Sequence, residues 1–262
     1  MHFHVVIPAR FASTRLPGKP LLEIGGKPMV QHVVERACAS GASEVLVATD
    51  DARIAQAVFD PRARERVIAH MTDAALPSGT DRVAAVARAR GWADDTIVVN
   101  VQGDEPFLSA RLIYQVAGLL NRDDTAAIAT LDTPIESLHD FLDPNVVKVV
   151  TARDGAALYF SRAPIPWSRE GAAHGLASQQ QFVGAMRHVG VYAYRVGALR
   201  QVTALAPTSL EQTEKLEQLR ALQSGLRIIV GTCLELPAPG VDTEADLQRA
   251  RARAGPWTKG VA

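Results

Sequence analysis

The stretch Phe3-His4-Val5-Val6-Ile7 has the composition of a buried β-strand, and it continues directly into the loop Pro8-Ala9-Arg10-Phe11-Ala12-Ser13-Thr14-Arg15-Leu16-Pro17-Gly18-Lys19-Pro20. In an α/β fold such a loop lies at the carboxyl edge of the sheet, where ligands bind. The loop carries the cations Arg10, Arg15 and Lys19, and Gly18 permits a close approach of the backbone. Guanidinium and ammonium groups suit a polyphosphate. Many basic loops are simply solvated, but the position after the first strand favours a phosphate-binding site here.

This loop is neither of the two commonest phosphate-binding loops. A dinucleotide fingerprint needs the pattern G-x-G-x-x-G, but Gly18 is the only glycine of this connection before Gly25. A P-loop needs a glycine five residues before the Gly-Lys pair and Ser or Thr after it, and those places hold Ser13 and Pro20. We therefore expect the loop to bind phosphate mainly with side chains, and Lys19 to be an exposed cation.

The composition excludes several other classes of function. The 262 residues can form one large α/β domain, and the zero net charge without a basic stripe predicts neither a nucleic-acid nor a membrane partner. No apolar run approaches the ~20 residues of a membrane span, and the N-terminus does not resemble a signal peptide. Cys38 and Cys233 lack metal-ligand spacing and indicate reduced thiols. These features predict a cytoplasmic protein.

Apolar runs alternate with amphipathic stretches in the first half of the chain. Strands are predicted at residues 45–49, 67–70 and 96–101. Helical patterns follow Pro28, begin near Ile54, and follow the turn Ser78-Gly79-Thr80. Alternation of helices with continuously apolar strands predicts a parallel sheet that is covered on both faces.

After Leu131 the pattern becomes richer in strands. Residues 145–150, 157–160 and 189–194 are typical of strands with little helix between them, whereas residues 170–181 are polar and predict a loop. The sequence then predicts one helix over 210–223, a strand over 227–230, a last helix after Thr243, and a tail beyond Gly255. We expect a single domain over 1–262, with an inserted β-rich lobe at about 132–196.

Two further segments place polar groups at strand ends. Pro77-Ser78-Gly79-Thr80-Asp81-Arg82 could contact a nucleotide base, although it could equally be a plain helix N-cap. Gln102-Gly103-Asp104-Glu105-Pro106 follows the strand at 96–101. A carboxylate there is a candidate Mg²⁺ ligand, since Mg²⁺ is held by one or two carboxylates together with substrate phosphates. The alternative for this segment is an ordinary Gly-Asp turn.

Two segments in the second half carry polar side chains on one face. Along Arg187-His188-Val189-Gly190-Val191-Tyr192-Ala193-Tyr194 the period of two puts His188, Tyr192 and Tyr194 on one face of a strand. A row of hydrogen-bonding rings suits a sugar acid or a solvated sheet face. On the predicted helix 210–223, acidic residues lie opposite a leucine stripe, and solvated acids are the default interpretation there.

Together these segments resemble the 3-deoxy-manno-octulosonate (Kdo) cytidylyltransferase family over nearly the whole chain. The resemblance rests on seven motifs in order: Ile7-Pro8-Ala9-Arg10-x-Ala12-Ser13-Thr14-Arg15-Leu16-Pro17-Gly18-Lys19-Pro20, Ser78-Gly79-Thr80-Asp81-Arg82, Asn100-Val101-Gln102-Gly103-Asp104-Glu105-Pro106, Tyr159-Phe160-Ser161-Arg162, Arg187-His188-x-Gly190-x-Tyr192, Leu216-Glu217-Gln218-Leu219-Arg220 and Gly240-Val241-Asp242-Thr243. Sialic-acid cytidylyltransferases are similar in fold, but their first loop is richer in glycine.

The resemblance implies an α/β fold with a Rossmann-like nucleotidyltransferase sheet and an inserted β-rich lobe that forms a homodimer. It implies the reaction of CTP with Kdo to CMP-Kdo and pyrophosphate, for lipopolysaccharide biosynthesis, with Mg²⁺ as cofactor. The site residues it implies fall into three groups: Arg10, Arg15, Lys19, Ser78, Gly79, Thr80, Arg82 and Gln102 for CTP; Arg162, His188, Tyr192, Glu217 and Gln218 for the sugar acid; and Asp104 and Asp242 for the metal. Arg10, Lys19, Asp104 and Asp242 are the implied catalytic residues.

Two alternatives remain open at this point. The same chemistry could act on another acidic sugar, such as a sialic acid or an amino-Kdo. The chain could also be a catalytically inactive nucleotide-binding relative, although Lys19 with the pair Asp104 and Asp242 argues against a pure binding module.

Overall fold

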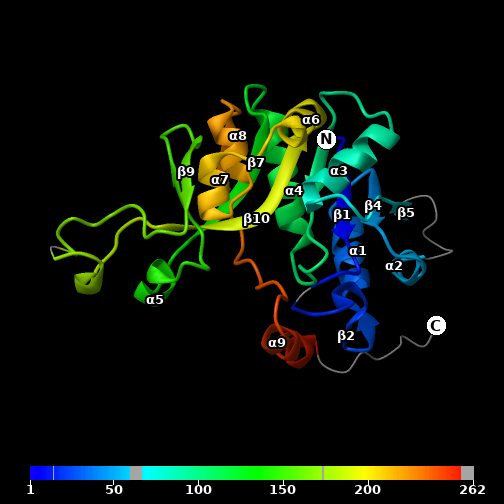
Figure 1. The fold of residues 1–262 in the computed structure, drawn as a ribbon, viewed down its shortest axis with the longest axis horizontal. Coiled ribbons are helices and arrows are strands. Elements are labelled where there is room, and N and C mark those ends of the chain that lie inside the picture. The colour runs from blue at the N-terminus through cyan, green and yellow to red at the C-terminus, as the bar shows by residue number, and fades with distance from the viewer. Residues whose placement is uncertain (14, 60–66, 173, 255–262) are drawn as a thin grey trace.

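The computed structural model describes residues 1–13, 15–59, 67–172 and 174–254 (Figure 1). The predicted tail beyond Gly255 lies outside these residues. In the described part, the central sheet runs in the order β11-β7-β10-β6-β1-β4-β5. Its strands are β1 (His4–Ala9), β4 (Glu44–Thr49), β5 (Val67–Met71), β6 (Ile97–Asn100), β7 (Ile128–Pro134), β10 (Met186–Arg195) and β11 (Ile228–Thr232). On this path β10 runs antiparallel to both of its neighbours, whereas the other neighbouring strands pair in parallel. The predicted α/β sheet is confirmed, and β10 makes it mixed where a parallel sheet was predicted.

Helices cover both faces of this sheet. One face packs against α1 (Met29–Ala39), α2 (Ala52–Ala57) and α4 (Ala110–Arg122). The other packs against α3 (Gly79–Ala89), α6 (Val196–Ala204) and α8 (Gln218–Gln223). The strands form because their side chains are buried on both faces, and every residue of β1 is buried.

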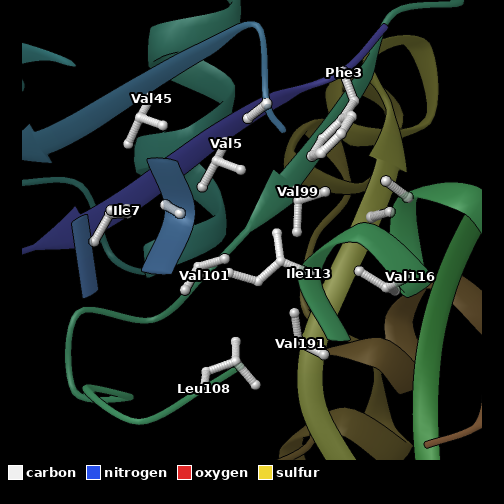
Figure 2. Packing of buried hydrophobic residues seen from close by; sticks show 14 of the residues in the cluster. Phe3, Val5, Ile7, Val45, Val99, Val101, Leu108, Ile113, Val116 and Val191 are labelled. Atoms are coloured by element: carbon white, nitrogen blue, oxygen red, sulfur yellow. The ribbon is translucent and has the colours of Figure 1, made fainter. Parts of the chain in front are cut away.

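The first strand lies at the centre of this packing. Val5 and Ile7 of β1 point to the same side as Val99 of β6, toward Ile113 and Val116 of α4 (Figure 2). Because β1 pairs with β4 on one side and β6 on the other, the carboxyl ends of β1 and β6 form the crevice where α/β sheets bind ligands.

The segment predicted as an inserted lobe, which we call the lobe, projects from one end of the sheet, and β10 runs from it into the sheet (Figure 1). Its hairpin of β8 (Lys148–Thr151) and β9 (Ala157–Ser161) pairs with the first residues of β10. The lobe also holds α5 (Leu138–Leu142) and the short 3-10 turn η2 (Leu176–Ser178), the latter in the segment predicted as a loop.

Three small elements surround the loop after β1. The 3-10 turn η1 (Lys19–Leu21) ends this loop, and the hairpin of β2 (Glu23–Ile24) and β3 (Lys27–Pro28) leads into α1. The last helix, α9 (Glu244–Ala254), packs beside β2 and so brings the segment before it back to the loop (Figure 1). No helix in the described ranges is long and apolar enough to cross a membrane.

The prediction of one helix over 210–223 is wrong. The chain forms α7 (Ser209–Glu214) and α8, and Lys215 between them has a φ of 54°. The Glu214 carboxylate accepts hydrogen bonds from Ser161 Oγ at 2.6 Å and Arg162 N at 2.9 Å, both in the lobe. These tertiary hydrogen bonds fix Glu214 against the lobe, and the helix ends at this residue.

The acids of this segment are also not simply solvated. Glu211 forms a bidentate ion pair with Arg220, at 2.8 Å to Nε and 2.5 Å to Nη2, and each side chain is only 12 % exposed. The pair connects α7 to α8. The default interpretation of solvated acids is therefore wrong for Glu211 and Glu214.

Residues 110–134, for which no element was predicted, form α4 and β7. The signal for α4 is present, because Leu112, Ile113, Val116, Ala117 and Leu120 recur with helical spacing and are all buried.

Candidate active site

A cavity of about 240 Å³ lies at the carboxyl ends of β1 and β6. Residues from the loop after β1, the start of α3, the turn after β6 and the segment before α9 line it together. The predicted residues among them are Arg10, Arg15, Lys19, Ser78, Gly79, Arg82, Gln102, Asp104 and Asp242. Nearly the whole predicted nucleotide and metal set thus meets in one cavity.

The ammonium group of Lys19 is the centre of this cavity. It lies 2.6 Å from Asp104 Oδ2 and 2.9 Å from Asp242 Oδ1, and it also donates to the carbonyl of Val241 at 3.0 Å. Burial lowers the pKa of Lys19, but the attraction of Asp104 and Asp242 outweighs it and raises the pKa above its ordinary value. The Lys19 side chain is only 12 % exposed, so the expectation of an exposed loop cation is wrong.

The two other cations of the loop are more open. Arg10 is exposed, and Arg15 donates from Nη2 to Asp242 Oδ1 at 3.0 Å while remaining 63 % exposed. Asp242 is therefore contacted by two cations from the same loop. A loop with one largely buried and two exposed cations can hold several negative charges of a polyphosphate at different depths.

Asp104 and Asp242 are 138 positions apart in sequence but converge on one cation. The Asp104 carbonyl accepts the N–H of Val241 at 2.9 Å, which fixes the segment before α9 against the turn after β6. Among the residues described, no group of three or more His, Cys, Asp and Glu forms a complete metal cage. A pair of carboxylates fits Mg²⁺, which usually completes its shell with waters and substrate phosphates.

Glu105 lies beside this pair in a half-buried position. Burial, with repulsion from Asp104 and Asp242, raises the pKa of Glu105 to about 8. Gly240 packs against this side chain so closely that a Cβ there would lie 2.7 Å from Glu105 Oε1. Gly103 is equally constrained, because its Cβ would lie 2.9 Å from the Pro8 carbonyl. Gly103 thus lets the turn after β6 approach β1, and Gly240 lets the segment before α9 approach that turn.

The start of α3 forms the opposite side of the cavity. Ser78 Oγ accepts the Asp81 N–H at 3.1 Å, so the N-cap interpretation of this turn is confirmed, while Ser78 also lines the cavity. Gln102 lies over Gly79, whose Cβ would be 3.3 Å from Gln102 Oε1. Gln102 Nε2 donates to Asn100 Oδ1 at 3.3 Å. An amide held over a glycine presents polar atoms at a defined position to a flat ligand.

Glu217 connects this side of the cavity to the helical pair α7 and α8. Its carboxylate interacts with the hydroxyls of Thr80 and Ser78, and burial raises its pKa above the ordinary value. Thr80 is itself buried, and its hydroxyl also meets Tyr194. Gln218 follows as the first residue of α8. The structure thus brings Glu217 next to the predicted nucleotide residues.

The rings of β10 lie on one face, as predicted from the period of two. The ring centroids of His188 and Tyr192 are 5.3 Å apart, and those of Tyr192 and Tyr194 are 5.8 Å apart. This arrangement survives a register shift between Val189 and Tyr192. The row lies on the same sheet face as α3 and α8, and so extends from the cavity side toward the lobe.

His188 is a neutral side chain in this environment. Burial, with a smaller repulsion from Arg187, lowers its pKa to about 3. Its Nε2 lies 3.0 Å from Thr130 Oγ1, and Phe160 packs edge-on at 5.0 Å. Burial, with smaller contributions from Tyr194 and Glu217, raises the pKa of Tyr192 well above its ordinary value. These side chains can exchange hydrogen bonds with hydroxyl groups but carry no charge.

Arg162 is held by the lobe itself. Its Nε donates to the Glu214 carbonyl at 2.7 Å and its Nη1 to the Pro144 carbonyl at 2.9 Å. It does not line the cavity described above. The carboxylate-binding role implied for Arg162 remains a prediction, and the contacts that the structure gives it join β9 to α7.

Sequence reasoning missed residues that support this site. Asp50 binds Arg82, Thr130 binds His188, and Glu214 binds the residue before Arg162 as well as Arg162 itself. The position of Asp50 directly after a predicted strand was the available signal. For Thr130 and Glu214 the partners lie more than 50 residues away, so local sequence carried no signal.

Comparison with known proteins gives a consistent result. Residues 4–228 match the family model described as cytidylyltransferase. Proteins named 3-deoxy-manno-octulosonate cytidylyltransferase are 54 % identical in Methylococcus capsulatus, over 95 % of this chain and 95 % of that protein, and 53 % identical in Aeromonas hydrophila, over 96 % and 98 %. A solved structure of CMP:2-keto-3-deoxy-manno-octonic acid synthetase complexed with CTP superposes with a TM-score of 0.84 at 42 % identity, covering 97 % and 98 % of the two chains.

Proposed function

The chain belongs to the 3-deoxy-manno-octulosonate cytidylyltransferase family, and from this premise we propose how its residues carry out the reaction. The enzyme activates Kdo with CTP and yields CMP-Kdo and pyrophosphate, which supplies activated Kdo for lipopolysaccharide biosynthesis. One observation carries the assignment of roles. The same cavity is lined by the cationic loop after β1, by the polar turn at Ser78, and by the carboxylates of Asp104 and Asp242, which converge on Lys19.

CTP occupies this cavity in our proposal. Its triphosphate lies along the loop after β1, where Arg10, Arg15 and Lys19 neutralise the phosphate charges. Its base lies between Ser78 at the start of α3 and Gln102. The support is the placement of these two sets on opposite sides of one cavity, together with the CTP complex of the related structure.

Asp104 and Asp242 are the residues that would hold Mg²⁺. A magnesium ion there would neutralise charge on the transferring phosphoryl group and lower the pKa of a bound hydroxyl. The support for this assignment is that both carboxylates contact the Lys19 ammonium, so their oxygens converge on one positive charge.

The sugar acid lies next to CTP, along the row of rings, in our proposal. His188 and Tyr192 would bind its hydroxyls, and Glu217 with Gln218 would close the site from α8, with Arg162 at the edge. The support for this placement is the contact of Glu217 with Thr80 and Ser78, which puts these groups directly beside the nucleotide cavity.

The reaction is a direct displacement. The anomeric hydroxyl of Kdo attacks the α-phosphorus of CTP in line with the leaving pyrophosphate. Its oxygen forms one P–O bond as the bond to pyrophosphate breaks, and its proton is released to solvent. Lys19 stabilises the charge that develops on the phosphates, and Arg10 and Arg15 hold the leaving group. No described residue set forms a Ser/His/Asp or Cys/His arrangement at the cavity, which fits a mechanism without a covalent enzyme intermediate.

We expect the enzyme to use CTP better than UTP, and to use purine triphosphates poorly. A pocket of fixed hydrogen-bonding groups rejects a base that leaves those groups unpaired, by factors of up to about 10⁴–10⁵. Pyrophosphate release would be measured with each nucleotide triphosphate at saturating Kdo and Mg²⁺, since this assay tests the proposed function directly. Turnover with ATP comparable to that with CTP would contradict the assignment of the base pocket.

We expect His188→Ala to raise the KM for Kdo by roughly tenfold and to leave the KM for CTP unchanged. The loss corresponds to one hydrogen bond, about 1–2 kcal/mol. Because the pKa of His188 is about 3, the wild-type KM for Kdo should show no histidine inflection between about pH 6 and 8. Steady-state kinetics with each substrate varied would measure both.

His139→Ala is the matched control, since this lobe histidine is 85 % exposed and should behave as wild type. If His188→Ala raised the KM for CTP and left the KM for Kdo unchanged, the proposal that the sugar acid lies along β10 would be contradicted.

We also propose that the enzyme is a cytoplasmic homodimer joined through the lobe. Large apolar side chains on and beside the lobe hairpin are exposed in the single chain: Leu158, Trp167, Leu176 and Val183. Leu158 lies on β9, which ends the sheet at this side. Burying them against a second lobe would remove apolar area from water. Light scattering should give twice the chain mass of 28.1 kDa, and Val183→Asp should shift the protein toward monomer. A wild-type monomer at micromolar concentration would reject this proposal.

A further inference from the structure

Asp50 joins the two sides of the nucleotide cavity without lining it. It directly follows β4, at the same carboxyl edge of the sheet. One carboxylate oxygen, Oδ1, accepts the N–H of Phe11 at 3.1 Å. The other, Oδ2, accepts a hydrogen bond from Arg82 Nη2 at 2.8 Å. Phe11 belongs to the phosphate loop and Arg82 to the first turns of α3, so one side chain contacts both.

Arg82 is a buried anchor of α3. Its side chain is 2 % exposed, and that of Asp50 is 11 % exposed. Its other terminal nitrogen, Nη1, donates to Thr72 Oγ1 at 2.6 Å, and Thr72 in turn donates to the carbonyl of Thr49 at the end of β4. Two terminal nitrogens of Arg82 are therefore engaged by the protein, which assigns it to holding α3 in place at the cavity wall.

Phe11 is the corresponding anchor of the phosphate loop. It lies between Arg10 and Ala12, which both line the cavity. Its carbonyl accepts the N–H of Gly18 at 3.3 Å, which closes the loop on itself. The ring packs under Gly18, where an added Cβ would lie 3.1 Å from it. Fixing the backbone of Phe11 thus fixes both the segment that carries Arg10 and the segment that leads into Lys19.

We propose that Asp50 is a positioning residue that holds the base side and the phosphate side of the cavity in one geometry. The proposal rests on CTP occupying this cavity. A nucleotide that spans both sides binds well only when their separation is fixed in advance, because preorganisation reduces the cost of ordering on binding. Loss of the Asp50 charge leaves the Arg82 guanidinium buried without its ion-pair partner, and frees α3 from the loop.

Asp50→Asn tests this role with an isosteric change. The amide oxygen can still accept the Phe11 N–H, whereas the ion pair with Arg82 is lost. We expect the KM for CTP to rise about tenfold or more, the KM for Kdo and kcat to change by less than about threefold, and the preference for CTP over UTP to fall. A purely structural role would lower thermal stability without changing base selectivity.

Asp73→Asn is the matched control, since this exposed aspartate neighbours Thr72 but bonds to the Ala75 N–H. It should behave as wild type. Lys19→Ala shows whether CTP uses the cavity at all. If Lys19→Ala weakened CTP use and Asp50→Asn changed neither KM nor selectivity, the positioning role would be overturned while the proposed function stood. If neither Lys19→Ala nor Asp50→Asn changed the use of CTP, the proposed CTP site would be rejected as well.

Should Asp50→Asn fail to fold, Asp50→Glu would be assayed. It keeps the charge for Arg82 but moves both oxygens by one methylene. We expect a folded enzyme with a KM for CTP that is raised several-fold and with reduced base selectivity. Wild-type values for both quantities would overturn the proposal.

Discussion

Replacing Asp104 or Asp242 by asparagine is expected to leave a folded protein that has lost turnover by a factor on the order of 10³. Metal ions contribute several kcal/mol of charge stabilisation in phosphoryl transfer, and each ~1.4 kcal/mol is tenfold in rate. The amide keeps the size of the carboxylate but not its charge, so a divalent cation would be held poorly. Pyrophosphate release at saturating CTP and Kdo would measure the loss.

Pyrophosphate release should also be measured for the wild-type enzyme after the divalent metal has been removed. We expect inactivity in excess EDTA and recovery when Mg²⁺ is returned. Glu244→Gln is the matched control, because this exposed acid lies two residues after Asp242 and pairs with Gln248 at the start of α9. An enzyme that is fully active without divalent metal, or an Asp104→Asn enzyme with wild-type turnover, would reject the proposed metal site.

Lys19→Ala is expected to lower kcat/KM by an amount that corresponds to a loss of about 2–4 kcal/mol of transition-state stabilisation. This is the usual loss when one electrostatic stabiliser of a transition state is removed. Lys19 is the cation that both metal-site carboxylates and the triphosphate would share. Its removal also leaves Asp104 and Asp242 facing each other without the ammonium between them. We therefore expect a modest loss of thermal stability as well. Removal of an exposed loop cation would instead leave the thermal stability almost unchanged.

Adding Mg²⁺ separates these two effects. The metal should restore the thermal stability of Lys19→Ala toward the wild-type value but should not restore activity. Arg15→Ala is the comparison within the same loop. Its effect should be smaller because Arg15 is 63 % exposed and, among the described residues, pairs with Asp242 alone. If Lys19→Ala kept the wild-type kcat/KM, the proposed role of Lys19 in the reaction would be rejected.

The α/β sheet and its order of elements were predictable because they depend on local patterns. Strands such as β1 and β4 are apolar on both faces, which only a doubly covered sheet requires. The helix break at Lys215 was not predictable, because the contacts that stop α7 come from Ser161 and Arg162 in the lobe. Tertiary hydrogen bonds there outweigh the helical pattern of the local sequence.

The same division holds within the site. By itself the sequence determined which segments end strands, and therefore that the cationic loop, the Ser78 turn and Asp104 share one edge of the sheet. It also determined the family, through motifs whose order spans the chain. Only the tertiary structure decided how these groups meet: that Lys19 is largely buried between two carboxylates, that His188 is uncharged, and that Asp50 connects α3 to the loop. Burial and pairing between distant residues set these properties, and neither can be inferred from residue type and spacing alone.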